Sequence, residues 1–237
     1  MGAIKSAIGD GIITFMWVFS ASTLGPITSV IGSIFGVEGL IFNLFITVSL
    51  VALMLFIFSF IAEALGGASF NPTLFAAFYA AGIQKESLFS VSLRLPAQAS
   101  GAAAGALTIK ELMPVQYKHM LGGPSLKVDV HTGAIAEGVL TFAIIFLALL
   151  IVLKGPRNSF LRNWLLAMST MMFFIAGSSY TGPSMNPVIA FGWAYVNNRH
   201  NTWEHFYVYW ISPFVGTILS ASLYGVIFPP PVKQKKA

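Results

Sequence analysis

The stretch GGASFNPT at residues 66–73 returns as GPSMNPV at residues 182–188, and this pair of segments decides the fold. Each copy follows a long apolar run and ends in a bulky apolar residue, Asn-Pro and a β-branched residue. Asparagine is a preferred helix N-cap, and proline suits the first helical position because its missing N–H is not needed there. The pattern therefore predicts two helix starts, one capped by Asn71 before Pro72 and one capped by Asn186 before Pro187.

The apolar stretches that follow, 72–81 and 187–196, are short. Ten residues of helix cover about 15 Å, roughly half of a bilayer core. A single Asn-Pro dipeptide is a common turn signal, but two copies in matched surroundings favour a repeated element over two unrelated turns. We expect two half-helices, placed alike in the two halves of a membrane protein.

The composition is that of an integral membrane protein. Of the 237 residues, 56% are hydrophobic and 9% are charged, whereas soluble domains carry about 25% charged residues. The length fits about six spans with short loops. The chain contains no cysteine, which excludes disulfides and thiol chemistry. The net charge is +5, but the basic residues form no continuous basic face away from the chain ends, so we expect no nucleic-acid partner.

Six longer apolar stretches are expected to span the membrane. They are residues 4–24, 39–62, 87–109, 131–153, 163–176 and 205–228. Between the first two, the Gly/Pro/Ser-rich residues 25–38 are expected to form a loop, and residues 110–130 form a polar loop. The first stretch has no clear cleavage site, so it is expected to remain as a span.

The two halves repeat beyond the Asn-Pro segments. Residues 10–15, DGIITF, match residues 137–142, EGVLTF. Three spans separate the copies, so the second half enters from the opposite side, which is an inverted repeat with its binding or conduction path near the midplane. We expect one channel domain over 1–237, with repeat halves at 1–112 and 131–228 and a basic cytoplasmic tail at 229–237.

Acidic residues inside the spans have two readings. Asp10, Glu63 and Glu137 are costly in hydrocarbon and are functional candidates, for instance as a proton relay. The alternative is a buried carboxylate that accepts hydrogen bonds from the N–H groups of a re-entrant loop. The repetition of Asp10 by Glu137, one behind each half-helix, favours this bracing role. No basic partner for these acids is apparent within the spans.

The distribution of Lys and Arg predicts the orientation. With both termini in the cytoplasm, nine basic residues lie inside: Lys5, Lys85, Arg94, Lys154, Arg157, Arg162, Lys233, Lys235 and Lys236. Four lie outside: Lys110, Lys118, Lys127 and Arg199. The excess favours cytoplasmic termini.

These features together resemble the aquaporin family over nearly the whole chain. The resemblance rests on the paired Asn-Pro half-helices, the acid-x3-Thr-Phe repeats, AQASG at 97–101 and the pattern Trp210-x2-Pro213-x2-Gly216. The NPT form of the first box, the basic charge, the short N-terminus and the lysine-rich end are similar to the plant small basic intrinsic protein subfamily. Both boxes depart from the usual NPA, since Thr73 and Val188 replace alanine and are expected to add bulk to the pore wall.

The resemblance implies a channel for water and small neutral solutes, with no cofactor or metal, in a homotetramer within the lipid bilayer. It also implies a four-residue outer constriction formed by Val51, Phe174, Pro183 and Ile189. Ile189 then stands at the usual arginine position and Phe174 at the usual histidine position, so the constriction has no cationic side chain. The tail resembles a dilysine retrieval signal, with Lys233 and Lys235 as its lysines, and implies an endoplasmic reticulum address.

Two functions from other classes remain as alternatives. A secondary transporter of a small solute is built on the same inverted repeat, but usually adds ionisable partners inside the spans. An intramembrane serine protease is suggested by GAS at 67–69, but needs a base near Ser69, and no histidine lies inside a span away from its ends. We therefore expect a channel and no enzyme activity.

Overall fold

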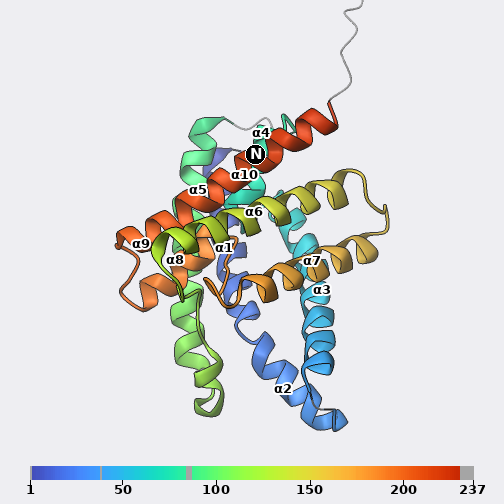
Figure 1. The fold of residues 1–237 in the computed structure, drawn as a ribbon, viewed down its shortest axis with the longest axis vertical. Coiled ribbons are helices and arrows are strands. Elements are labelled where there is room, and N and C mark those ends of the chain that lie inside the picture. The colour runs from blue at the N-terminus through green and yellow to red at the C-terminus, as the bar shows by residue number, and fades with distance from the viewer. Residues whose placement is uncertain (1, 38, 84–86, 230–237) are drawn as a thin grey trace, which may run out of the picture.

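The computed structural model describes residues 2–37, 39–83 and 87–229, and the secondary structure of these residues is helical, with no strand among them. The first half contains α1 (Ala3–Ala21), α2 (Leu24–Phe35), α3 (Leu40–Ala64), α4 (Pro72–Ala80) and α5 (Leu88–Leu112). The short 3₁₀ helix η1 (Val115–Met120) leads to the second half. That half contains α6 (Val130–Leu153), α7 (Ser159–Gly177), α8 (Pro187–Val196), α9 (Trp203–Phe206), the π-helical segment η2 (Tyr207–Ile211) and α10 (Ser212–Ile227). In Figure 1, α3 and α5 run along the long axis of the molecule, whereas α6 and α7 cross it.

The short helices α4 and α8 begin at the two prolines that the sequence singled out. They have nine and ten residues, and Asn71 and Asn186 are their N-caps. Such helices are too short to cross a bilayer, and each follows an irregular segment, 65–71 or 178–186, that turns the chain back. The structure thus confirms six longer membrane helices with two re-entrant half-helices in an inverted repeat.

The expected loop at 25–38 is wrong for most of its length, because α2 occupies residues 24–35. Pro26 lies in the first turn, where proline is tolerated, and Gly36 ends the helix with a φ of 62°. A break at Ser22 and Thr23 separates α1 from α2, and both hydroxyls donate back to carbonyls of α1. The small residues that indicate a loop in water form helix here, since a membrane segment satisfies its backbone internally.

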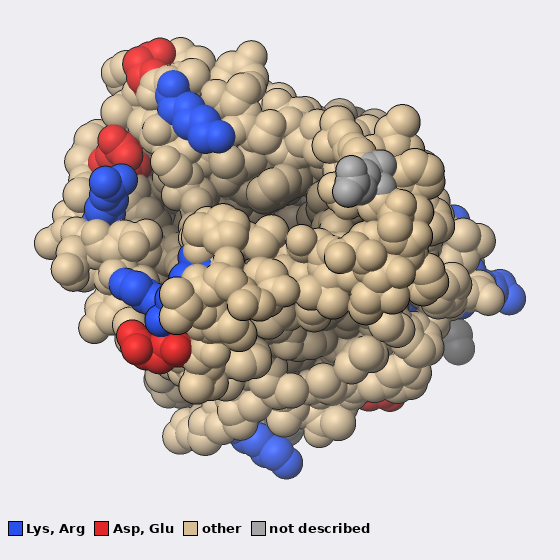
Figure 2. Space-filling view, turned by 90° about the horizontal axis from the view of Figure 1, so that it is seen from below, with Lys and Arg blue, Asp and Glu red and all other residues tan. Residues whose placement is uncertain are grey.

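Five helical segments in the described part of the chain are long and apolar enough to cross a membrane, and α1 with α2 forms the first of them. The remaining long helix, α5, has 25 residues but carries Arg94, Gln98 and several serines and alanines. Many large apolar side chains are exposed on the outside of the helices, as expected for a lipid-facing surface. Figure 2 shows a mostly uncharged face whose few charged side chains lie near its rim.

Glycines bring helices into close contact in the same way in both halves. In the first half Gly101 of α5 lies against the carbonyl oxygen of Gly11 in α1. In the second half Gly216 of α10 lies against the carbonyl oxygen of Gly138 in α6. A side chain at either position would overlap a backbone atom, so these contacts require glycine. They fix α1 on α5 and α6 on α10, which places the acid-bearing helices behind the half-helices.

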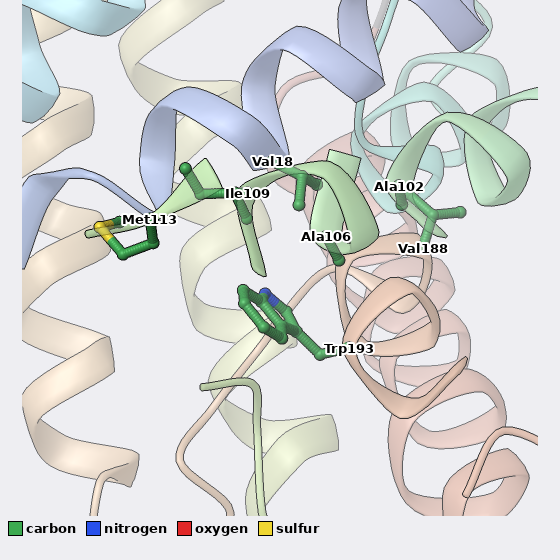
Figure 3. Close-up of a cluster of buried hydrophobic side chains, with 7 residues drawn as sticks. All are labelled: Val18, Ala102, Ala106, Ile109, Met113, Val188 and Trp193. Carbon is green, nitrogen blue, oxygen red and sulfur yellow. The ribbon is translucent and has the colours of Figure 1, made fainter. Parts of the chain in front are cut away.

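A buried apolar cluster anchors α8 to the first half of the chain. Trp193 of α8 packs against Val18 of α1 and against Ala106 and Ile109 of α5 (Figure 3). Gly192 allows α8 to approach the backbone of α5 at Ala102. The half-helix of one repeat is therefore held by long helices of the other, so the two repeats form one packed unit.

The last span is continuous in sequence but changes its helical pitch. Residues 207–211 form a π-helical segment just before Pro213. Pro213 has no N–H for the ordinary backbone bond, and the Ser212 hydroxyl donates to the Tyr207 carbonyl at 3.0 Å. Tyr209 of this segment is buried, and its hydroxyl donates to the carbonyl of Thr181 at 2.9 Å.

Candidate functional site

The candidate site is a cavity of about 300 Å³ at the N-termini of the two half-helices. Asn71 and Asn186, one from each repeat, both line it. The Oδ1 atom of Asn71 accepts from the Thr73 N–H at 3.0 Å, and the Oδ1 atom of Asn186 accepts from the Val188 N–H at 3.3 Å. Each asparagine caps its own helix, so both positive helix ends are directed at one cavity.

The rest of the cavity wall is mostly apolar. Its polar residues besides the asparagines are Ser69, Ser184 and Thr170. The Thr170 hydroxyl is directed at its own helix, where it donates to the Leu166 carbonyl at 2.8 Å. Apolar side chains complete the wall, and they include Trp17, Leu55, Leu74, Ile144, Leu166 and Ile189. Such a wall gives a passing polar molecule few places to bind apart from the asparagine pair.

Two hydrogen bonds join the repeats beside the cavity. The Nδ2 atom of Asn186 donates to the Phe70 carbonyl at 2.8 Å, and the Thr73 hydroxyl lies 3.3 Å from the Met185 carbonyl. Thr73 and Val188 are fully buried and do not line the cavity. The structure therefore places both side chains behind the asparagines, and not on the wall that the sequence interpretation gave them.

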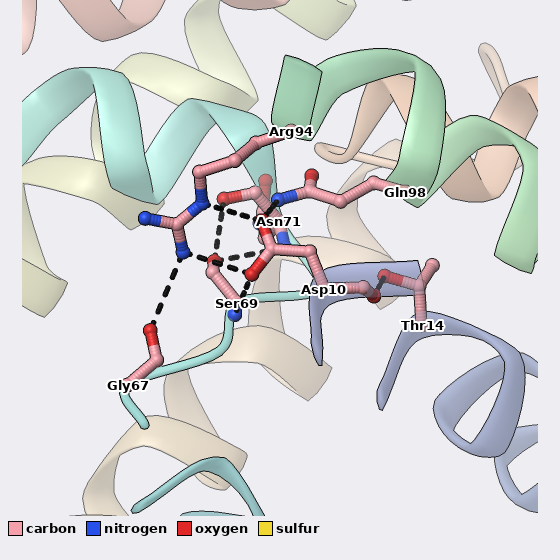
Figure 4. A network of polar contacts seen from close by, with 7 residues as sticks. All are labelled: Asp10, Thr14, Gly67, Ser69, Asn71, Arg94 and Gln98. Atoms are coloured by element: carbon pink, nitrogen blue, oxygen red, sulfur yellow. Dashed lines mark hydrogen bonds and ion pairs between the residues drawn. The ribbon is translucent and has the colours of Figure 1, made fainter. Parts of the chain in front are cut away.

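Asp10 of α1 supports the segment before α4. Its carboxylate accepts from the Ser69 N–H at 2.8 Å and from the Gln98 amide at 2.6 Å. Arg94 donates to both carboxylate oxygens, at 2.7 and 2.8 Å. Figure 4 shows Arg94 and Gln98 reaching Asp10 from α5, with Arg94 also directed at the Gly67 carbonyl. The carboxylate thus links α1, α5 and the re-entrant segment.

The ion pair corrects two expectations. Arg94 is buried between helices and is paired with Asp10, so it does not belong to the cytoplasmic basic cluster, and Asp10 does have a basic partner. The Arg94 guanidinium also lies over the ring of Phe75, 4.6 Å from its centre, in α4. Sequence reasoning missed this role, although the position of Arg94 one helical turn before Gln98 was a usable signal.

Glu137 of α6 occupies the equivalent place behind α8. Its Oε1 atom accepts from the N–H groups of Ser184 and Met185, at 2.9 and 2.6 Å, and its Oε2 atom accepts from the Thr181 hydroxyl at 2.8 Å. These bonds hold Met185 at a φ of 50°, which is uncommon for a residue with a side chain. No basic side chain among the described residues forms an ion pair with Glu137, so the second acid is held by neutral donors alone. Glu63, the third acid, is exposed at the end of α3.

Of the four residues expected at the outer constriction, only Ile189 lines this cavity. Val51 is buried in the contact of α3 with Ala167 of α7, and Pro183 is buried against Gly177. Phe174 is 46% exposed on α7. Two other residues of α3 and α7 line the cavity instead. They are Leu55, one turn after Val51, and Thr170, one turn before Phe174.

Two further expectations concern other parts of the chain. Lys233 and Lys235 of the tail lie outside the described residues. Within the part of the chain that the structure describes, no group of three His, Cys, Asp or Glu side chains could hold a metal ion.

Two oppositely inserted half-helices whose N-termini meet at one cavity, inside an inverted repeat of six longer helices, define a membrane channel. The sequence model of the major intrinsic protein family matches residues 1–224. The chain belongs to this family, that of the aquaporins, and to its small basic intrinsic protein subfamily.

Similar proteins cover the whole chain. Aquaporin SIP1-2 from Zea mays is 58% identical, over 99% of this chain and 98% of the relative. Aquaporin SIP1-1 from Arabidopsis thaliana is 55% identical, over 100% of this chain and 98% of the relative. Among solved structures, the aquaglyceroporin from Plasmodium falciparum superposes with a TM-score of 0.69, covers 96% of this chain and 98% of its own, and is 18% identical. This last likeness supports the fold.

Proposed function

We propose that this protein is a passive channel for water and small neutral solutes that excludes ions and protons at the asparagine pair. The observation that carries the proposal is the convergence of Asn71 and Asn186, with both helix N-termini, on one largely apolar cavity. Nothing in this arrangement requires a chemical step. We therefore propose a conduit without enzyme activity.

The mechanism follows from the direction of the donors. Asn71 and Asn186 use their side-chain oxygens for the caps and are left with N–H groups as their donors. A water molecule between them accepts hydrogen bonds and must turn its oxygen towards the pair. It then cannot pass a proton along a single file, and the two positive helix ends repel cations. The apolar wall keeps water from being held elsewhere.

Both alternative functions are weaker on this structure. A proton-coupled transporter needs a titratable group that exchanges partners, but Asp10 is already bonded to Arg94, Gln98 and the Ser69 N–H. A serine protease needs a base beside Ser69, and the cavity that Ser69 lines contains no histidine. The Ser69 hydroxyl instead donates to the Asn71 carbonyl at 3.3 Å.

The test is osmotic shrinkage of proteoliposomes, followed by stopped-flow light scattering. We expect shrinkage faster than in empty liposomes, unaffected by a proton or sodium gradient, and a proton leak equal to that of empty liposomes. Glycerol and urea as osmolytes then measure the solute range. Water flow at the rate of empty liposomes would overturn the proposal, and flow that needs an ion gradient would favour the transporter.

We place the channel in the endoplasmic reticulum membrane, with both termini in the cytoplasm and four copies in one assembly. Without Arg94, eight of the nine expected basic residues remain on the cytoplasmic side against four outside, so the charge bias supports the orientation. The proposed location in the endoplasmic reticulum rests on the expected retrieval lysines Lys233 and Lys235. The proposed tetramer rests on the resemblance to the aquaporin family. A Lys233→Ser/Lys235→Ser variant with an internal tag tests the address, because an unchanged reticular pattern would exclude the tail signal. The mass of the detergent-solubilised protein by light scattering tests the tetramer.

We also propose the functional division of the chain: one channel domain over 1–237, repeat halves at 1–112 and 131–228, and a basic tail at 229–237. The carboxylates of Asp10 and Glu137 brace the two re-entrant segments within it. Their hydrogen bonds to Ser69, Ser184 and Met185 support this role.

A further inference from the structure

The two Asn-Pro boxes are not equivalent in how their asparagines are held. Phe70 and Met185 each precede the asparagine of their box. The carbonyl of Phe70 accepts from the side-chain Nδ2 of Asn186, the asparagine of the opposite repeat, at 2.8 Å. By the repeat symmetry, the carbonyl of Met185 should accept from the Nδ2 of Asn71. The donor that the structure gives it is instead the hydroxyl of Thr73, at 3.3 Å.

The Thr73 hydroxyl also fixes Asn71 directly. It lies 2.7 Å from the Oδ1 atom of Asn71, which already accepts from the Thr73 N–H at 3.0 Å. Thr73 is fully buried, so water does not compete for this hydroxyl. The hydroxyl has one hydrogen and two acceptors within reach, and both acceptors belong to the asparagine boxes. Val188 occupies the same place in the second box, is equally buried and has no hydroxyl.

The consequence is a difference in the number of donors that face the cavity. Both donors on Asn71 Oδ1 lie on the side of the capped helix, which directs Nδ2 away from that helix, and Asn71 lines the cavity. In the described part of the chain no acceptor is bonded to Nδ2 of Asn71, so both of its hydrogens are available there. Asn186 uses one of its two Nδ2 hydrogens to donate to the Phe70 carbonyl, so one hydrogen is left for the cavity.

We propose that Thr73 is a positioning residue that keeps both side-chain N–H groups of Asn71 in the lumen. Its one hydrogen is shared between Asn71 Oδ1 at 2.7 Å and the Met185 carbonyl at 3.3 Å, so the hydroxyl holds Asn71 and also stands where the Asn71 amide would reach that carbonyl. The pair then presents three N–H groups to a passing molecule, two from Asn71 and one from Asn186. This inference rests on the proposed function, because it assigns a role within the passage of water.

Removal of the hydroxyl takes away the group that lies 3.3 Å from the Met185 carbonyl and shares its hydrogen with it, and a buried carbonyl without a partner is costly. The Asn71 amide is the neighbouring donor, as Asn186 is for Phe70. In a Thr73→Val variant, which keeps the shape of the side chain, we expect Asn71 to turn one N–H to Met185 and withdraw it from the lumen. Water passing the pair would lose one hydrogen bond.

The experiment compares water permeability in proteoliposomes for four proteins: wild type, Thr73→Val, Thr73→Ser and Thr217→Val. Thr217 is a matched control, because it is fully buried and its hydroxyl donates within α10 to the Pro213 carbonyl at 2.8 Å. We expect Thr73→Val to conduct about fivefold more slowly, the factor for one neutral hydrogen bond. Thr73→Ser and Thr217→Val should stay within about twofold of wild type. If the Thr73→Val protein does not fold, Thr73→Ala is used in its place, because it removes the same hydroxyl.

A second measurement does not depend on conduction. Nuclear magnetic resonance of the detergent-solubilised protein follows hydrogen exchange at Nδ2 of Asn71, whose signal is identified by its loss in Asn71→Asp. Both hydrogens should exchange rapidly with water in the wild type, and one should become slow in Thr73→Val. Equal exchange in the two proteins would overturn the inference, as would a valine variant that conducts like wild type. If wild type itself does not conduct, the proposed function fails, and the exchange measurement still decides the placement of Asn71.

Discussion

The Nε atom of Arg94 lies 2.7 Å from Oδ2 of Asp10, and both side chains are buried between α1 and α5. The corresponding acid of the second repeat, Glu137, is held by two backbone N–H groups and the Thr181 hydroxyl. The two re-entrant segments are thus braced in different ways, by an ion pair in one half and by neutral donors in the other. Loss of charge should therefore affect the two halves unequally.

Replacing Asp10 by asparagine should be severely destabilising. The variant removes the buried carboxylate charge to which Arg94 donates two hydrogen bonds, and breaking a buried ion pair costs about 3–5 kcal/mol. Thermal unfolding of the detergent-solubilised protein measures the effect. The double variant Asp10→Asn/Arg94→Gln removes both charges and should recover part of the loss. Arg162→Met is the control, because Arg162 lies near the exposed start of α7 and its removal should change stability by less than about 0.5 kcal/mol. A double variant as unstable as the sum of its single variants would contradict the pairing.

Replacing Glu137 by glutamine should be much milder than Asp10→Asn. Glutamine keeps an oxygen acceptor for the Ser184 and Met185 N–H groups, and the Thr181 hydroxyl can accept from its amide. We expect a cost of about 1 kcal/mol, the scale of one hydrogen bond. Glu137→Leu, which removes all acceptors, should destabilise the protein far more. The unfolding temperatures of the two variants should differ clearly, and equal values would show that the hydrogen bonds are not the stabilising feature.

The glycine contacts predict which small substitutions the fold rejects. A Cβ at Gly101 or Gly216 would overlap the backbone carbonyl of Gly11 or Gly138 in the neighbouring helix. Gly101→Ala and Gly216→Ala should therefore cost at least about 1–3 kcal/mol and lower the yield of folded protein. Gly225 in α10 has open space around it, so Gly225→Ala serves as the matched control. Size-exclusion profiles with thermal unfolding distinguish these outcomes, and a Gly216→Ala protein as stable as the control would exclude the close contact.

The parts of this fold that follow from local rules could be predicted from the sequence. The starts of α4 and α8 depend on Asn-Pro capping within a few residues, and the repeat of residues 10–15 at 137–142 placed an acid behind each half-helix. The helix at 24–35 was missed because its glycines and serines suggest a loop in water, whereas the membrane favours a continuous helix. The partner of Asp10 was missed because Arg94 is 84 residues away along the chain. The residues that face the cavity from α3 and α7 depend on how each helix is rotated about its axis, which packing decides and sequence spacing does not.

Mercuric salts should leave water conduction unchanged. Inhibition by mercury needs a thiol in or near the pore, and this chain has no cysteine. The measurement is stopped-flow shrinkage of proteoliposomes with and without mercuric chloride, at a concentration that leaves empty liposomes intact. Strong inhibition that a thiol reagent reverses would show that another site in the protein binds mercury.

Ile189 is expected in the pore from the resemblance to other aquaporins, and the structure also places it on the cavity wall. It lines the cavity with the asparagine pair, whereas Phe174, another residue of the expected constriction, is half exposed on α7. Ile189→Arg would add cationic donors to an otherwise apolar section of the wall. A hydrogen bond to a charged group is worth about 1.5–3 kcal/mol, so the ratio of water to glycerol permeability should change at least about tenfold. The proton leak should stay low, because the half-helix ends provide that barrier independently.

Phe174→Ala tests whether Phe174 lies on the surface of α7 or forms part of the constriction. If Phe174 lies on the surface as the structure has it, this variant should keep the wild-type ratio of water to glycerol permeability. A constriction that includes Phe174 would be widened by the loss of the ring, and glycerol would then pass more readily relative to water. Stopped-flow measurements with sucrose and with glycerol as osmolytes give both ratios on the same liposomes. An Ile189→Arg protein with the wild-type ratio, together with a changed ratio for Phe174→Ala, would move the constriction from the asparagine cavity to the end of α7.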